Sequence, residues 1–470
     1  MPTNVQHLSL DERRARGRQA AERTPVSSHR GWTPDAARPD PVALLEEQNA
    51  TRDADLVPVR HGRMSASSFT FYRGAARVMA ADLRTTPRAG LIVQLCGDAH
   101  LSNFGGFASP ERTLLLDLND FDETLPGPFE YDVMRMAASF TIAARSNGFA
   151  KGDVKDVTLA SVSAYREAMA SFAGMRTLDV WYARLAEEDV VAGAKAIART
   201  KEEEKELKRS ERNIDKARTR DSLQALSKLA EKVDGSYRII SQPPTVVPMR
   251  DLSATYGLSG DEEETVIRDI FRAYRATLQD DRRRLLEKFE FVDAARKVVG
   301  VGSVGTRAFI VLLQGRDDQD PLFLQVKEAT TSVLEDHLPH SRFNQPGERV
   351  VQGQRMMQAA SDIFLGWSKG LDASRHYYWR QLRDMKLSAL VEQMGPTGLR
   401  YYAHICGWTL ARAHARSGDP VAIDAYLGES DEFDRAMTNF ARRYADQNER
   451  DYEEFVGAIR SGRLAATMDV

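Results

Sequence analysis

Cysteine is scarce in this chain, with only Cys96 and Cys406 among its 470 residues. Two cysteines cannot build the disulfide framework on which small secreted proteins depend, and their scarcity suits a reducing compartment. We therefore expect a cytoplasmic protein whose stability depends on a hydrophobic core.

Long apolar runs and a strong net charge are also missing. No run approaches the length of a membrane span, and the N-terminal residues lack the apolar centre of a signal peptide. The formal net charge of -3 gives no overall positive field for attracting nucleic acid or an anionic membrane. The sequence thus predicts no membrane span and no nucleic-acid partner, and it leaves the oligomeric state open.

The composition is that of a globular protein, with 42% hydrophobic residues in a chain long enough for about two to four folding units. Helical periodicity, short apolar runs and Gly/Pro breaks suggest how these units are arranged. The predicted parts are an N-terminal arm (1–60), a large mostly helical unit with two polar loops (61–290), a small β-rich unit (291–386) and C-terminal helices (387–470). Within the small unit we expect strands at "KVVGVGSVGTRAFIVLLQG", "PLFLQVKEA", "DIFLGW" and "HYYWRQL", and a helix from about Glu348 to Ala360.

Polar residues crowd into "LCGDAHLSNFGGF", from Leu95 to Phe107, directly after an apolar run that reads as a buried strand. A buried polar group must replace the water that it loses, so such clusters tend to be functional sites. Asp98 and Asn103 lie in this loop, and a short hairpin leads onward to "DLNDFDE". A loop carboxylate can accept a proton from a hydroxyl, and an amide oxygen with a second carboxylate can hold Mg²⁺. Asp and Asn also commonly cap turns, so the cluster by itself leaves both interpretations open.

A glycine-rich segment follows much later, with Gly300, Gly302 and Gly305 spaced as GxGxxG. In a dinucleotide-binding fold these glycines lead from a strand into a helix, whereas here they lead into an apparent strand, "TRAFIVLLQG". A glycine hairpin between two strands can instead cover phosphates with its backbone N–H groups. In the next strand, alternation puts Lys327 on the same face as Phe323 and Gln325, where it can point into a cleft. The alternative is an ordinary exposed lysine.

The polar loop "GDAHLSN" resembles the "HGDxHxxN" catalytic loop of aminoglycoside-phosphotransferase-like kinases. The segment "NDFDETLPGPFEYDVMRMA" resembles their metal-binding aspartate and the later aspartate that opens a helix. The resemblance implies that Asp98 is the catalytic base, that Asn103 and Asp120 bind the metal, and that Asp132 is structural. Asp120 is preferred because its spacing to Asp132 fits the family pattern without a gap. The remaining candidate site residues are His100, Asp117, Asp122, Arg73, and either Glu335 or Glu348 as the partner of Lys327.

A closer resemblance extends over most of the chain. The segments "RHGRMSASSFTFYRGAA", "GDAHLSNFG", "DLNDFDE", "QVKEA" and "GWTLARAHARSGDP" together look like the bacterial family named domain of unknown function 2252. This resemblance implies a kinase-like fold and supplies no substrate.

Two departures from the kinase pattern are informative. Cys96 stands where the catalytic loop usually has a histidine. The motif order is also reversed, because Asp98 precedes Gly300 and Lys327, and "LARAHARSGD", which resembles the helix before the catalytic loop, lies near the C-terminus. One circular permutation accounts for this order. The predicted fold class is therefore α+β, a circularly permuted protein-kinase-like fold with a predominantly helical large lobe and a small β-rich lobe.

The function expected from this reading is ATP- and Mg²⁺-dependent phosphoryl transfer to a hydroxyl of an unidentified small molecule or protein, with the nucleotide bound between the lobes. Transfer of the AMP group is one alternative, because a kinase-like cleft can hold ATP in a reversed pose. A catalytically silent nucleotide-binding regulator is the other, although the presence of Asp98, Asn103, Asp120 and Lys327 together argues against it.

Overall fold

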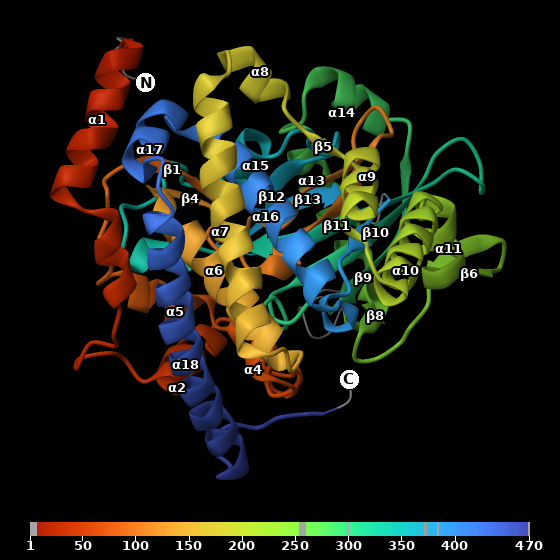
Figure 1. Cartoon of the computed structure of the whole chain (residues 1–470). Coiled ribbons are helices and arrows are strands. Elements are labelled where there is room, and N and C mark those ends of the chain that lie inside the picture. Colours follow the sequence, from red (N-terminus) through yellow and green to blue (C-terminus); the bar gives the residue numbers. More distant parts are fainter. Residues whose placement is uncertain are drawn as a thin grey trace.

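The computed structural model describes residues 7–252, 260–298, 300–370, 372, 374–382 and 385–468. The fold is a mixed α and β structure in which helices dominate and every described strand pairing is antiparallel. Figure 1 shows long helices on one side of the molecule and the largest sheet beside them. The predicted α+β class is thus confirmed at this level.

The predicted N-terminal arm (1–60) and the residues that follow it up to Leu83 consist largely of helices. The elements are α1 (Leu10–Arg23), η1 (Val26–Gly31), α2 (Pro41–Asn49), α3 (Val57–Met64), α4 (Ser68–Gly74) and α5 (Ala76–Leu83). Helix α1 packs on α17 (Pro420–Leu427), and η1 packs on α18 (Glu432–Arg460). Arg38 joins the two chain ends, since its guanidinium donates to Asp82 at 2.7 Å and to Asp451 at 2.6 Å. The first residues are therefore an integral part of the helical body.

The helical body is built around α6 (Phe129–Ser146), α7 (Lys151–Gly174), α16 (Pro396–Ser417) and α18. Almost every residue of α6 is buried, because it is apolar on nearly all sides and other elements surround it. Helix α16 lies along α7 although the two are far apart in the sequence (Figure 1). The C-terminal helices thus complete the body that the first half of the chain begins.

Short strands and further helices connect these parts. Before α6 come β1 (Ile92–Leu95), η2 (Leu101–Asn103), β2 (Phe104–Ala108), β3 (Leu114–Leu118) and β4 (Leu125–Pro128). After α7 come α8 (Thr177–Tyr182), β5 (Leu185–Ala186), α9 (Glu187–Ile197), α10 (Lys201–Arg218), α11 (Ser222–Leu229), β6 (Ala230–Val233) and β7 (Ser236–Ile239). Strand β14 (Leu387–Ser388) and η4 (Val391–Gln393) precede α16.

The largest sheet has six strands in the order β12-β13-β11-β10-β9-β8. Their bounds are β8 (Val246–Pro248), β9 (Glu290–Lys297), β10 (Ala308–Gln314), β11 (Pro321–Ala329), β12 (Gly366–Lys369) and β13 (His376–Gln381). Around the sheet lie α12 (Met249–Leu252), α13 (Gly260–Arg275), α14 (Asp280–Leu286), η3 (Val333–Asp336) and α15 (Pro346–Met357).

Side chains alternate across β10 and β11, so each face of the sheet has its own core. Val311 and Leu324 pack with Tyr274 of α13 on one face. Ile310 and Phe323 pack with residues of α11 on the other. The predicted alternation in β11 is confirmed. Leu322, Leu324 and Val326 join the α13 cluster, and Phe323 joins the opposite one.

One predicted strand is misplaced. The segment "DIFLGW" was expected to be extended throughout, but the strand β12 begins only at Gly366. The Asp362 carboxylate accepts a hydrogen bond from the backbone N–H of Phe364 at 2.7 Å, which holds the preceding residues in a turn. Such local side-chain bonds compete with strand formation.

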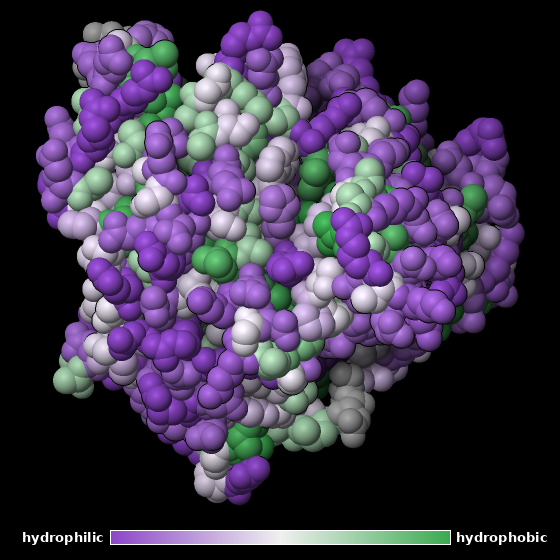
Figure 2. Space-filling view, viewed as in Figure 1, coloured by the Kyte–Doolittle hydropathy of each residue, from purple (hydrophilic) through white to green (hydrophobic). Residues whose placement is uncertain are grey.

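Within the part of the chain that the structure describes, no helix is both long enough and apolar enough to cross a membrane. The face drawn in Figure 2 is predominantly hydrophilic, with isolated apolar residues.

A buried carboxyl group at the start of α6 makes the stability of this body depend on pH. Glu130 is fully buried, one oxygen accepts a hydrogen bond from Ala89 N–H at 2.6 Å, and the other has no partner among the described residues. Burial raises the pKa of Glu130 from 4.5 to about 7, partly offset by the Ala89 hydrogen bond. Between these pH values the folded protein keeps a proton that the unfolded chain has released, so stability falls as pH rises.

Replacing this carboxyl should remove that cost. We expect Glu130→Gln to raise the free energy of unfolding by about 3 kcal/mol at pH 8 and to change it little at pH 4, where both states are protonated. Denaturant unfolding of wild type and variant at both pH values measures this. An equal effect at the two values would contradict the assignment.

Candidate active site

Asp132 fixes the backbone of the first polar loop. Its carboxylate accepts hydrogen bonds from Cys96 N–H at 2.8 Å and from Gly97 N–H at 3.0 Å. His414 of α16 lies 3.2 Å from the same carboxylate. Gly97 has a φ of +84°, and a Cβ there would collide with the backbone of Glu123. The first turn of α6 and the end of α16 therefore set the loop that carries Asp98.

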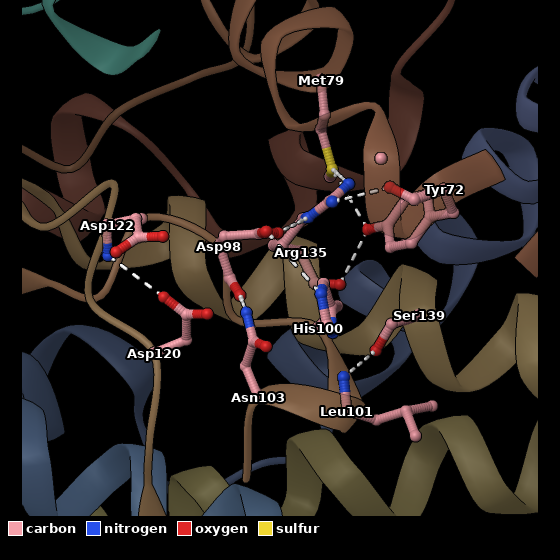
Figure 3. Close-up of polar contacts among 12 residues, drawn as sticks. Tyr72, Met79, Asp98, His100, Leu101, Asn103, Asp120, Asp122, Arg135 and Ser139 are labelled. Atoms are coloured by element: carbon pink, nitrogen blue, oxygen red, sulfur yellow. Dashed lines mark hydrogen bonds and ion pairs between the residues drawn. The ribbon is translucent and has the colours of Figure 1, made fainter. Parts of the chain in front are cut away.

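Asp98 lies at the centre of this loop (Figure 3). Arg135, one turn after Asp132 on α6, donates to its carboxylate at 2.8 Å, and Asn103 donates its amide to the Asp98 carbonyl at 2.8 Å. His100 Nε2 is 3.7 Å from the other carboxylate oxygen. Burial raises the pKa of Asp98, while Arg135 and then Arg73 oppose the rise. Burial also holds the pKa of His100 well below its usual value, so this imidazole is neutral.

The second polar loop lies against the first. The backbone N–H of Asn119 donates to the carbonyl of Asn103 at 3.0 Å, which joins the two loops directly. Asp120 accepts from Asp122 N–H at 3.2 Å. Burial and the neighbouring Asp122 charge raise the pKa of Asp120, with Lys327 acting in the opposite direction. The loop thus holds two carboxylates that repel each other beside Asn103.

Lys327 reaches this pair from β11. Its ammonium nitrogen is 2.6 Å from Asp122 and 3.7 Å from Asp120. Tyr378, the cross-strand neighbour of Lys327 on β13, donates its hydroxyl to Asp122 at 2.7 Å. Burial opposes ionisation of Asp122, but Lys327 and then Tyr378 hold its pKa below the usual value. The predicted lysine therefore faces the predicted acidic loop.

The glycine-rich turn joins β9 to β10, which confirms its strand-turn-strand context. N-terminal residues hold it in place. Arg63 donates to the Gly300 carbonyl at 2.7 Å, and Asp53 N–H donates to the Gly305 carbonyl at 2.8 Å. A Cβ on Gly302 would lie 2.9 Å from the Arg73 carbonyl, so glycine is needed for this close approach.

Two cavities meet at the acidic loop. The larger, of about 760 Å³, is lined by Lys327, Gln325 and Arg380 of the sheet and by residues of the polar loops. The smaller, of about 350 Å³, is lined by Asp98, His100, Asn103, Asp122, Arg73 and Gly302. Both are lined by Asp120, Gly300 and Ser303. The candidate site is therefore a cleft with two adjacent compartments that share these three lining residues.

Comparison with known proteins assigns the chain to a family. Residues 52–458 match the family described as uncharacterized protein conserved in bacteria, the domain of unknown function 2252. The chain belongs to this family. No curated protein and no solved structure matches it.

Some of the residues predicted to form the site of this family member lie outside the cleft. Asp117 pairs with Arg412 inside the helical body and accepts from Ala359 N–H at 2.8 Å, which commits it to structure. Gly305 lines neither cavity and lies against the Arg52 side chain. Neither candidate glutamate pairs with Lys327 within the described structure. Glu335 lies 3.8 Å from Arg349, and Glu348 is in the first turn of α15.

The partner of Lys327 therefore has to be corrected from a helix glutamate to Asp122. Helix α15 instead presents Arg349 at the acidic loop, where it donates to the carbonyls of Asp122 at 2.7 Å and Thr124 at 2.5 Å. Where a helix glutamate was expected, α15 thus carries Arg349, which binds backbone carbonyls. The counter-charge of Lys327 is the Asp122 carboxylate in the acidic loop.

Several residues of this site were not anticipated. Arg135 could have been found, because it follows Asp132 by one helical turn and so shares its face. Tyr378 required the register of β11 and β13, which the sequence does not reveal. Glu123 also lines the smaller cavity, and burial raises its pKa to about 7, opposed mainly by Arg349. Arg52 comes from the presumed arm, so no local signal marked it.

Proposed function

We propose that this protein transfers a phosphoryl group from ATP, with Mg²⁺, to a hydroxyl of an acceptor. The observation that carries the proposal is the meeting of Asp98, Asn103 and Asp120 with Lys327, which comes from a distant part of the chain and lies 3.7 Å from Asp120. A carboxylate base, two oxygen ligands for a hard cation and a phosphate-binding cation are the groups that such a reaction requires.

We also infer a circularly permuted kinase-like arrangement. The strand-turn-strand glycines, the lysine on the next strand and a helix packed on that strand follow the order of a kinase small lobe. Helix α16 lies beside the polar loop, with Tyr402 donating to the Leu101 carbonyl at 2.8 Å. This contact supports the idea that the C-terminal helix precedes the loop in the unpermuted order.

The donor set suits Mg²⁺. Within the described residues, no group of three or more His, Cys, Asp or Glu side chains is arranged to hold a metal ion. Mg²⁺ commonly binds through few protein oxygens and completes its shell with water and phosphate. Asn103 and Asp120 would hold it, and burial together with the Asp122 charge raises the pKa of Asp120, an effect that a bound cation would oppose. The ion would neutralise phosphate charge as the transferred group moves.

Each compartment then has a role. The larger cavity takes the nucleotide, with its phosphates directed to Lys327 and the glycine turn. The smaller cavity takes the acceptor, whose hydroxyl proton passes to the Asp98 carboxylate. At the same time the acceptor oxygen bonds to the γ-phosphorus, and the bond between the γ-phosphorus and the β-phosphate oxygen breaks. ADP leaves, and Arg135 holds Asp98 in position throughout.

Incubation with isotopically labelled ATP and Mg²⁺, followed by mass spectrometry of the protein and of added metabolite pools, tests the proposal. Transfer of phosphate is the expected result. A gain of AMP would identify nucleotidyl transfer, and no transfer to any pool would favour a binding protein without chemistry.

Lys327 provides a test of nucleotide binding. We expect Lys327→Met to weaken MgATP binding roughly 10- to 100-fold, the worth of a charge-assisted contact with phosphate. Because the variant leaves the half-buried Asp122 beside Tyr378 without its main counter-charge, the matched variant is Lys327→Met with Asp122→Asn. Calorimetric titration should show weak binding in both variants, while thermal unfolding of the double variant should return toward wild type. Unchanged affinity in both would contradict the role of Lys327.

A further inference from the structure

The smaller cavity has a wall of arginines opposite its acidic loops. Arg52, Arg73 and Arg77 line it, and all three come from the segment that ends at α5. They line only this cavity, whereas Lys327 and Arg380 line only the larger one. The cleft therefore has two separate groups of cations, one on each side of Asp120.

These arginines differ in how their charges are balanced. Arg77 forms ion pairs with Glu47 and Asp336, both at 3.3 Å. Arg52 donates to the Val304 carbonyl, and its Nε has no partner in the described structure. Arg73 has neither a hydrogen bond nor an ion pair to any described residue, although its Nε is buried. The Arg73 guanidinium lies over the Phe69 ring, 5.9 Å from its centroid, and the charges of Glu392 and Asp98 act on it without forming an ion pair.

A fourth guanidinium, that of Arg60, adds positive charge close to this wall. Arg60 is fully buried and donates only to neutral groups, namely Asn49 at 2.7 Å, Gln48 at 2.8 Å and the Gly74 carbonyl at 2.9 Å. Burial and the nearby Arg52 charge lower the pKa of Arg60. Burying a guanidinium without a partner lowers the stability of the folded protein. Such a group is best explained where a bound ligand supplies the missing anion.

We propose that the acceptor is a small molecule with an anionic group, phosphate or carboxylate, which binds to Arg73 and Arg52 while its hydroxyl faces Asp98. This inference rests on the proposed phosphotransfer for the role of Asp98, and the anion site itself does not depend on it. Guanidinium groups bind both anions through paired N–H donors, so the two share one chemistry. The charge of Arg73 opposes the rise that burial causes in the pKa of Asp98, so the two groups lie within electrostatic reach of each other.

Binding measurements on the full-length protein test the inference. Glycerol 3-phosphate, glycerate and glycerol supply the same small alcohol with a phosphate, a carboxylate and no charge. We expect calorimetry to show binding of one or both anions and no binding of glycerol. Arg73→Gln should weaken anion binding roughly 10- to 100-fold. Arg84→Gln, at an exposed residue that ends α5, is the matched control and should leave it unchanged.

The same experiment separates this site from the nucleotide site. Arg73→Gln should leave MgATP affinity within about threefold of wild type, and Lys327→Met should leave anion affinity equally unchanged. Because Arg73 forms no hydrogen bond or ion pair with a described residue, the unfolding temperature of the Arg73→Gln variant should stay close to that of wild type. Equal loss of MgATP and anion binding in Arg73→Gln, or no anion binding by wild type, would overturn the inference. Anion binding without MgATP binding would preserve this site and reject the proposed function.

Discussion

Asp98→Asn should lower the rate of phosphoryl transfer by about 10²- to 10⁴-fold, the usual worth of a positioned acid–base group. The asparagine keeps the size of the side chain and can still accept the hydrogen bond from Arg135, but it cannot take the acceptor's proton. MgATP affinity should change little, because Asp98 lies in the smaller compartment. Steady-state kinetics with the acceptor found by labelling, together with MgATP titration, measures both quantities.

The control for this variant is Asp156→Asn, which removes an exposed carboxylate of α7 and should leave both quantities unchanged. Asp98→Asn removes the negative charge that faces Arg135. Thermal unfolding of the variant checks that the loop remains stable without it. Full turnover in a folded Asp98→Asn protein would remove the catalytic role from this residue.

Asp120→Ala should impair binding and rate together. Loss of a metal-ligating carboxylate leaves the phosphates poorly neutralised, so we expect turnover to fall about 100-fold or more and the Mg²⁺ concentration needed for half-maximal activity to rise. Titration of Mg²⁺ at fixed ATP concentration measures this shift. Asp122→Asn is the informative comparison, because Asp122 is engaged by Lys327 and Tyr378.

The Mg²⁺ dependence decides between the two carboxylates. A shift in Asp120→Ala that is larger than in Asp122→Asn supports the assignment of Asp120. An unchanged Mg²⁺ dependence in Asp120→Ala, with a shift in Asp122→Asn, would move the ligand to Asp122. Asp117 no longer competes, since it is paired with Arg412 in the helical body.

The parts of the site that the sequence predicted are those carried by local patterns. The polar loop after a buried strand, the acidic loop after the next hairpin and the lysine on an alternating strand each depend on near neighbours in the chain. Asp132 was identified only through the resemblance to the kinase motif, in which an aspartate after the acidic loop opens a helix. Their roles came from the resemblance to a kinase family, since residue type alone left open whether Asp98 and Asn103 form a site or cap turns.

The parts that were missed depend on contacts between distant segments. The Lys327–Asp122 pair requires the six-stranded sheet to be placed against the acidic loop, and no spacing encodes that placement. Arg73 was already a candidate site residue, but Arg52 of the same arginine wall comes from the predicted arm (1–60), which is rich in Arg, Pro and Asp and shows little periodicity. The helices there, such as α2, are short, and their burial against α18 outweighs weak local preference. Tertiary packing therefore determines both the Lys327–Asp122 pair and the helical structure of the N-terminal region.

Titration of MgATP into the wild-type protein by calorimetry is the measurement that tests the account most directly. The account predicts saturable binding at a single site that requires Mg²⁺, is weakened by Lys327→Met and persists in Arg73→Gln. Absence of MgATP binding to the folded wild-type protein would contradict it.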